Sequence, residues 1–321
     1  MFNMSATCIW KQLWDLTEHS KVPHCKSCRF NKCLETGMFI KPSALLKMSC
    51  RTEDTTMETI IGQLLYLDSR RSTILMNKFS FENPGLEEIV KRKKLNIVTQ
   101  DSTFQMSAED WRFFGMFTTV EFLLNLDFME ELDLNDKMIL LKSFSAKATL
   151  LFSALRTMKE KSDRLMTPGG QEIVPDVLAV LFNVSMGFLF QIRSRLINKL
   201  IQLNVTNEEF FLVTVILFCD PGTSIFYFLY VFEMKTVLLT AVTSLSEQAL
   251  PTITSRRTSY TSALFKYCQL THQQTAHNRF TELLSLCHVV NKNIEDIQSL
   301  TIIAKFHLKT TECKQLYEDI I

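Results

Sequence analysis

Two cysteines near the start of the chain, Cys25 and Cys28, are separated by two residues, and side chains at this spacing could bind a metal ion. Such a pair can hold two corners of a tetrahedral zinc ion. A structural zinc site needs four ligands, so the pair alone predicts an incomplete site, and idle thiols are the alternative. Three cations follow the first cysteine closely, Lys26, Arg29 and Lys32, and they are candidates for contacts with DNA phosphates.

The first 50 residues carry seven Lys or Arg against three Asp or Glu, a net charge of +4, whereas the whole chain carries +1. Phosphate attraction by this segment alone is expected to be nonspecific and to be lost with salt. Patterns typical of enzymes, such as a glycine-rich phosphate loop, G-x-S-x-G or H-E-x-x-H, do not occur, and six histidines are scattered. We therefore expect a protein that is not an enzyme.

The elements that must position these residues are predicted to be helices. A length of 321 residues suggests about two domains, and 46% hydrophobic residues suffice for a sizeable core, while only 8 glycines and 7 prolines argue against a turn-rich β fold. Nine cysteines without a preceding signal segment indicate a reducing compartment.

Hydrophobic periodicity predicts a helix over 55–77, a break at Asn83-Pro84-Gly85, and a short basic helix or linker over 86–95. Ser107 and Asp110 form a capping-box pattern at the start of the next helix. Three segments are apolar on all faces and are expected in a middle layer between other helices, namely 111–126, 138–155 and 210–218. Further helices are expected over 175–203, 244–274 and 275–307, with a hairpin or turn over 165–174.

The run Cys25-x-x-Cys28-Arg29-Phe30-x-Lys32-Cys33-Leu34-x-x-Gly37-Met38 resembles the end of the second zinc module of nuclear hormone receptors. The resemblance implies that Cys25 and Cys28 are zinc ligands. The sequence departs from the family pattern because a first zinc module is absent. Cys8, His19 and His24 could supply further zinc ligands, but they lack the expected spacing. The cofactor implied is zinc.

The resemblance continues over most of the chain. Residues 57–95 resemble the divergent first helical region of nematode-type members, Trp111–Lys142 resembles the family signature, and Arg279–Val290 resembles the helix used for homo- or heterodimers. It implies a mainly α chain, a three-layer α-helical sandwich preceded by a partial zinc-finger module. The expected domains are the zinc-finger part (1–50), a hinge and first helical region (51–106), and a ligand-binding domain (107–321).

The last six residues, Leu316–Ile321, fit an apolar-apolar-x-acid-apolar-apolar pattern that predicts an amphipathic helix. In the family this activation helix closes the ligand pocket, and its acid caps a coactivator helix. The resemblance gives that role to Asp319, with Glu318 second, while Leu124 stands where a clamping lysine is expected and Lys142 is its substitute. The predicted groove residues are Lys142, Leu316, Tyr317, Glu318, Asp319 and Ile320. An ordinary packed helix is the alternative.

The same resemblance implies a pocket for an apolar small molecule. The candidate lining residues are Phe114, Phe117, Thr118, Glu121, Phe152, Arg156, Met186, Phe190 and Cys287. The charged pair Glu121 and Arg156 is expected either to form an ion pair or to anchor a ligand's polar group. Since 25 Phe and 14 Met could fill the interior, a ligandless core is the alternative.

Residues 222–240 are expected to be an insertion, because family members pass directly from a proline like Pro221 to the next helix. Its aromatic run is an aggregation hazard if exposed, and we hypothesise translated intron sequence or a gene-model error. An extra apolar helix docked on the core is the alternative. The neighbouring apolar runs are shorter than the ~18–20 residues that span a bilayer, so membrane association through 210–242 is a minor alternative.

The function expected is that of a nuclear, ligand-regulated or ligandless transcription factor that contacts DNA and transcriptional coregulators. The alternative is an interaction module that does not bind DNA and dimerises with a complete receptor.

Overall fold

The computed structural model describes residues 53–91, 95–100, 106–220, 245–307 and 314–321. The predicted zinc segment, with Cys25, Cys28, Lys26, Arg29 and Lys32, lies outside the described residues, and so does the predicted insertion 222–240.

The elements are α3 (Glu53–Asn77), β1 (Lys78–Phe79), α4 (Leu86–Lys91), β2 (Val98–Thr99), α5 (Ala108–Leu124), η3 (Asp127–Glu131), α6 (Leu134–Lys159), α7 (Val177–Leu181), α8 (Met186–Leu203), α9 (Asn207–Phe218), α11 (Ala249–His272), η4 (Gln273–Thr275), α12 (Ala276–Leu284), α13 (Leu286–His307) and α14 (Gln315–Ile320). The strands β1 and β2 pair antiparallel, with Lys78 opposite Thr99. The predicted mainly α fold is confirmed.

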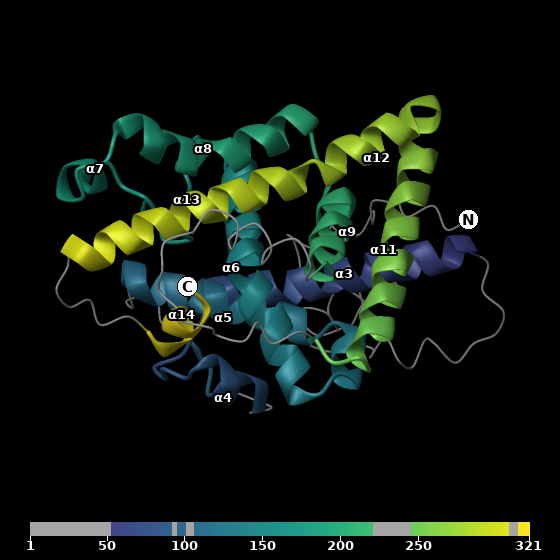
Figure 1. Cartoon of the computed structure of the whole chain (residues 1–321), viewed down its shortest axis with the longest axis horizontal. Helices are drawn as coiled ribbons and strands as arrows, with labels where there is room; N and C mark the ends of the chain where they lie inside the picture. The colour runs from purple at the N-terminus through teal and green to yellow at the C-terminus, as the bar shows by residue number, and fades with distance from the viewer. Residues whose placement is uncertain (1–52, 92–94, 101–105, 221–244, 308–313) are drawn as a thin grey trace, which may run out of the picture. The chain divides into compact units, whose positions relative to one another are not determined.

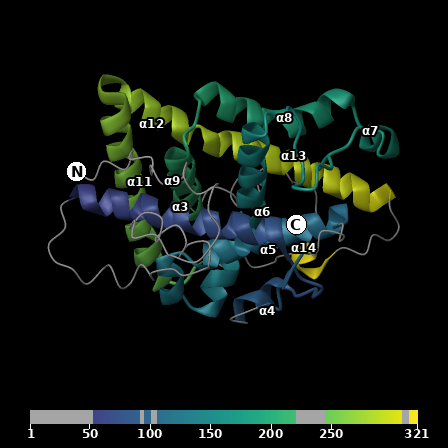
Figure 2. The same ribbon diagram turned by 180° about the vertical axis from the view of Figure 1, so that it is seen from behind.

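The helices form three layers. In Figure 1, α8, α12 and α13 run along the top, α3 and α5 cross below, and α6 and α9 stand between them. The contacts agree, because α6 packs against both α5 and α8, and α9 packs against α3 and α11. The view from behind shows α3 crossing α6 and α9 (Figure 2). The described residues of the chain thus form the predicted helical sandwich.

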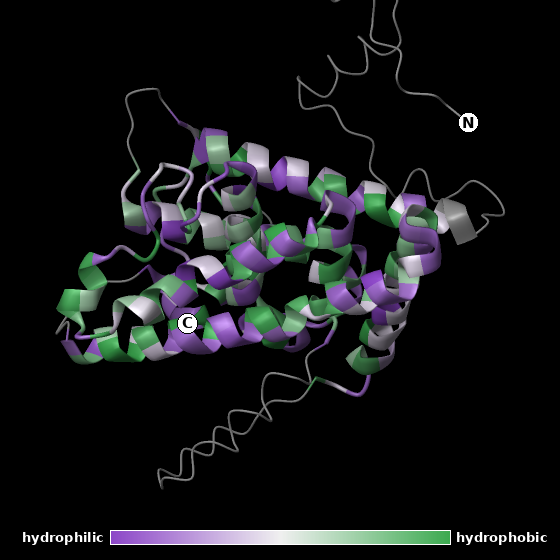
Figure 3. Cartoon of the chain, turned by 90° about the horizontal axis from the view of Figure 1, so that it is seen from above, coloured by the Kyte–Doolittle hydropathy of each residue, from purple (hydrophilic) through white to green (hydrophobic). Residues whose placement is uncertain are grey.

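The apolar segments owe their burial to these layers. Every residue of α9 from Glu209 to Ile216 is buried, and Phe210 and Phe211 contact Phe152 of α6 at ring-centroid distances of 6.0 and 6.1 Å. Helix α5 is contacted by α3, α6 and α14, but it lies with α3 and not in the predicted middle layer (Figure 1). Hydrophobic and hydrophilic residues alternate along the helices in Figure 3, as expected when one face of an outer helix meets solvent.

Helix α6 is long and apolar enough to cross a membrane, but 61% of its most apolar window is buried inside the protein. Burial on that scale is what the core helix of a helical sandwich requires. Length and composition are therefore weak grounds for a membrane span here.

Local sequence signals fix where several helices begin. The predicted capping box is confirmed: Ser107 Oγ accepts the Asp110 amide hydrogen, and the Asp110 carboxylate accepts from the Ser107 amide. Thr206 and Glu209 form a second capping box at α9. The predicted turn over 165–174 is also present, with a bridge between Met166 and Glu172.

Two of the predicted long helices are wrong. The segment 175–203 is broken between α7 and α8, because Asn183 adopts a left-handed conformation (φ 50°) and Ser185 caps a new helix. The segment 275–307 is divided into α12 and α13 at Ser285. Asn tolerates the left-handed region and Ser favours helix starts, so the first break follows local preferences that the apolar periodicity hides.

Candidate functional site

A cavity of about 1160 Å³ lies between α3, α5, α6, α13, α14 and the connection 165–182. Its apolar lining includes Leu75, Met116, Leu150, Phe152 and Ile297. The cavity is large enough for a drug-sized apolar molecule, since such sites typically measure ~300–1,000 Å³.

Two of the nine predicted pocket residues, Phe152 and Arg156, line this cavity, and the other seven do not. Phe114, Phe117 and Thr118 are buried in the core. On α8, Met186 and Phe190 are 52% and 60% exposed. Glu121 and Cys287 are partly buried elsewhere.

On α3, the polar part of the cavity wall includes Arg71 and Asp68, which form a side-chain pair. Arg71 donates to Asp68 Oδ1 through Nε at 3.0 Å and through Nη2 at 2.7 Å. The guanidinium also lies 4.1 Å from the centroid of the Phe152 ring, a cation–π contact. Burial lowers the pKa of Arg71, and Asp68 opposes that shift. The pair therefore holds a cation against the cavity wall.

Arg156 of α6 is a second, half-buried cation in the cavity wall. Its Nη2 donates to the Met166 carbonyl. Among the described residues its buried Nε makes no hydrogen bond, and Glu160 Oε1 lies 3.6 Å away. Burial lowers the pKa of Arg156. A guanidinium with spare donor capacity beside a cavity can bind an acceptor on a ligand.

The predicted alternative of an ion pair between Glu121 and Arg156 is not what the structure contains. Burial raises the pKa of Glu121, and Arg70 is the cation that opposes this shift. Arg156 lies beside Glu160 instead. The two residues are on different helices and belong to different charge clusters.

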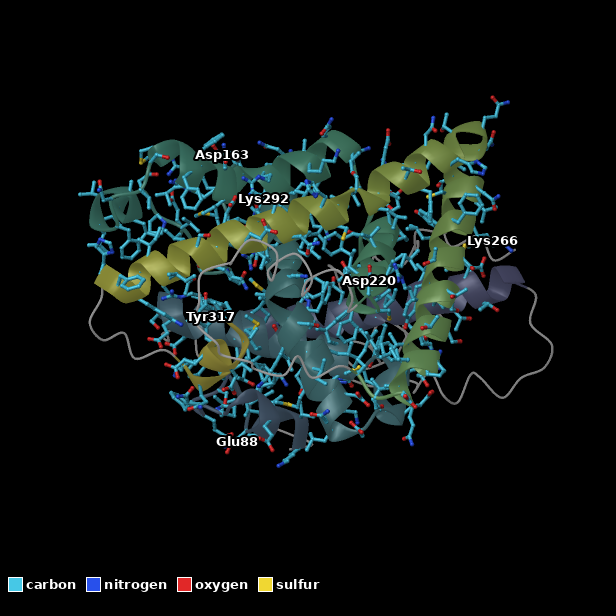
Figure 4. The ribbon with its side chains drawn as sticks, in the orientation of Figure 1. Glu88, Asp163, Asp220, Lys266, Lys292 and Tyr317 are labelled. Carbon is cyan, nitrogen blue, oxygen red and sulfur yellow. The ribbon has the colours of Figure 1, made fainter. Side chains whose placement is uncertain are left out.

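The C-terminal helix α14 closes one end of the cavity. Tyr317, Glu318 and Ile320 of this helix line it, together with the adjoining Ile321. Leu316 is 0% exposed and belongs to the core. Tyr317 is labelled on this helix in Figure 4. A molecule in the cavity would thus contact α14 directly.

Asp319 faces away from the cavity toward α4. Its Oδ2 accepts a hydrogen bond from the Leu86 amide at 2.7 Å. Lys142 is exposed on α6, and its charge contributes to the lowered pKa of Glu87 on α4, after the larger effect of Lys91. Leu124, where the resemblance leads one to expect a lysine, is half-buried against the core.

The segment predicted for dimerisation, Arg279–Val290, spans the end of α12 and the start of α13, and it begins with an inward-facing residue. Arg279 is 8% exposed and donates from Nε to Glu209 Oε1 at 2.8 Å and from Nη1 to the Leu203 carbonyl at 2.5 Å. The charge of Arg279 is therefore paired inside the domain.

Sequence reasoning missed Asp68 and Arg71. Their signal is an acid and a cation three residues apart on one helix, a spacing that brings side chains together. Within the described ranges no cluster of three or more His, Cys, Asp or Glu side chains is arranged to hold a metal.

Comparison with known proteins gives a consistent result. Residues 93–307 match the family model described as the ligand-binding domain of nuclear hormone receptor. The chain is similar to the Caenorhabditis elegans nuclear hormone receptor family members nhr-51 (30% identity, covering 93% of this chain and 76% of that one) and nhr-167 (32%, covering 92% and 80%). Its fold is similar to the Ultraspiracle ligand-binding domain of Drosophila melanogaster (TM-score 0.51, 15% identity, covering 81% of this chain and 96% of that one).

Proposed function

The chain belongs to the nuclear hormone receptor family, and we propose that it regulates RNA polymerase II transcription in the nucleus through a ligand that fills the cavity and sets the position of α14. One observation carries this proposal: Tyr317 and Ile320 of α14, with the adjoining Ile321, form part of the cavity wall. A ligand that contacts them stabilises the closed helix, because it binds this arrangement better than one with α14 detached.

The ligand proposed is a mostly apolar molecule with one hydrogen-bond acceptor or anionic group. Apolar side chains make up much of the lining, and six of its ten charged residues are cations. Arg156, whose Nε has no hydrogen bond among the described residues, is the proposed anchor. The cation–π contact and the Asp68 pair already engage Arg71, so it is a weaker candidate.

Binding of coregulators through α14 and Lys142, and dimerisation through α12 and α13, belong to the same proposal. Contacts with DNA would fall to residues 1–50, with Cys25 and Cys28 as zinc ligands. An interaction module that does not bind DNA would use the helical domain alone. Duplex binding by the full chain across a salt series separates the two, because sequence-selective binding at physiological salt requires more than phosphate attraction.

The function is tested with the full chain fused to a heterologous DNA-binding domain that drives a reporter gene. Ala146 lines the cavity, so Ala146→Phe fills part of it. Ala108 is exposed at the start of α5, and Ala108→Phe is the matched control. Moving cells from lipid-replete to delipidated medium should change reporter output ~5-fold or more for the wild type and the control.

The same change of medium should leave Ala146→Phe nearly unresponsive. Equal responses of the wild type and Ala146→Phe would rule out regulation through the cavity. Circular dichroism of both variants establishes that they fold.

A further inference from the structure

The short helix α4 lies against α14 and α6 in the manner of a docked partner helix. Leu86, Ile89 and Val90 occupy positions i, i+3 and i+4, the spacing by which an amphipathic helix presents apolar anchors to a groove. Leu86 is 0% exposed and Ile89 is 3% exposed, and Val90 packs on the core. The opposite face carries Glu87 and Lys91, which pair with each other in solvent.

Two hydrogen bonds join the start of α4 to α14, and they run in opposite directions. Asp319 of α14 accepts from the Leu86 amide at 2.7 Å, and the Asn83 side chain accepts from the Gln315 amide at 2.9 Å. The first supplies an otherwise unpaired helix-start amide with a charged acceptor. These bonds connect residues more than 230 positions apart, so they specify how the two segments fit together.

The approach is close at Gly85. A Cβ at this position would lie 2.8 Å from Asp319 Oδ2 and 3.2 Å from Gln315 Cγ. Any larger residue would push the carboxylate away. Figure 4 places Glu88 on α4 and Tyr317 on the neighbouring α14. Lys142 of α6 acts electrostatically on Glu87 of α4.

We propose that α4 is an internal occupant of the helix-binding surface formed by α6 and α14, and that a partner helix docks there only after α4 has left. The partner is a short amphipathic helix with apolar residues at i, i+3 and i+4, whose first amide would take the place of the Leu86 amide at Asp319. This inference rests on the proposed role of α14 in recruiting partners. It adds that the free receptor blocks its own surface.

The exchange is physically accessible because α4 is six residues long. An isolated helix of this length is not stable in water, so α4 depends on its packing against the domain, including α6 and α14. A tethered segment nevertheless competes strongly, since a short linker gives it an effective concentration in the millimolar range. Release of α4 should therefore raise the affinity for an external helix by a large factor.

The test uses the full chain and a fluorescent synthetic peptide of residues 82–91 as the external helix. Gly85→Val opens the contact with Asp319, while Gly62→Val is the matched control, because a Cβ at Gly62 meets nothing within 4 Å. Fluorescence anisotropy should show the peptide bound by Gly85→Val at least ~100-fold more tightly than by the wild type or Gly62→Val. Ile89→Glu, which removes a buried anchor of α4, should give the same increase.

Asp319→Asn in the Gly85→Val background should weaken peptide binding, because the charged acceptor is lost. Equal peptide affinity of the wild type and both released variants would overturn the inference, as would peptide binding that ignores Asp319→Asn. Cooperative thermal unfolding of each variant establishes that it folds. If the peptide binds as expected while reporter output of the released variants stays at the wild-type level, α4 does occupy the surface and the proposed function of α14 fails.

Discussion

Arg279 and Glu209 form a buried bidentate ion pair that ties α12 to α9. Arg279 Nη2 lies 2.5 Å from Glu209 Oε2, and the Glu209 residue is 0% exposed. The same carboxylate accepts from the Thr206 amide in the capping box. Burial by itself raises the pKa of Glu209, but the hydrogen bonds from Arg279 and Thr206 outweigh it and hold that pKa below its ordinary value of 4.5. One acid thus starts a helix and neutralises a buried cation.

Replacing Glu209 should strongly lower the stability of the fold. Glu209→Ala leaves Arg279 buried without a counter-charge, and we expect a loss of about 3–5 kcal/mol in the free energy of unfolding. Glu208 is the matched control, because it is half-buried and, within the described part of the chain, its side chain makes one long hydrogen bond, 3.4 Å from Tyr267. Urea denaturation should show a loss under about 1 kcal/mol for Glu208→Ala. Similar losses for both variants would mean that the pair contributes little.

The same pair predicts a dependence on acid. A carboxylate whose pKa is lower in the folded than in the unfolded state contributes its full stability above the unfolded value and loses it as the pH falls. The wild type should therefore lose stability on moving from pH 6 to below 4.5. The Glu209→Ala variant should lose less over the same range. Parallel losses in urea titrations at each pH would assign the acid sensitivity to other groups.

Glu121 should behave in the opposite sense. Burial raises its pKa, so its carboxylate form opposes folding at neutral pH and this cost disappears as the pH falls below the unfolded value. Glu121→Gln should raise the urea midpoint at pH 7 and give little gain near pH 4. A lower midpoint at pH 7 would show that the carboxylate has a stabilising partner.

Asp136 should anchor the start of α11. It is 2% exposed and accepts from the Ser246 amide at 2.8 Å and from Ser246 Oγ at 2.6 Å. Asp136→Ala removes both charge-assisted bonds and should cost about 1.5–3 kcal/mol of unfolding free energy. Glu130 is exposed nearby, and Glu130→Ala should change stability by less than about 0.5 kcal/mol. Equal stability of the two variants would show that Asp136 does not anchor the start of α11.

Much of this fold is predictable from the sequence because its signals are local. The capping residues Ser107 and Asp110 fix one helix start, and the continuous apolar composition of 210–218 predicts burial on every side. The C-terminal helix follows from the spacing of Leu316 and Ile320. Each of these depends on neighbours a few positions away.

The cavity is harder to predict, since its walls come from segments far apart in the sequence. Phe114 and Phe152 are both large aromatic residues on apolar helices, yet the first fills the core and the second lines the cavity. Their periodicity is the same, and only the packing of neighbouring helices separates the two roles. The hydrogen bond between Asp319 and Leu86 joins residues 233 positions apart, so no local sequence pattern predicts it.

The most direct measurement is native mass spectrometry of the purified full chain, followed by solvent extraction of whatever it holds. A receptor whose cavity is closed by α14 should retain an apolar molecule, and the Ala146→Phe variant should retain none while still folding. Leu316→Ala, which removes a fully buried anchor of α14, should release the molecule. Bare protein from the wild type, or equal retention by the wild type and Ala146→Phe, would contradict the account.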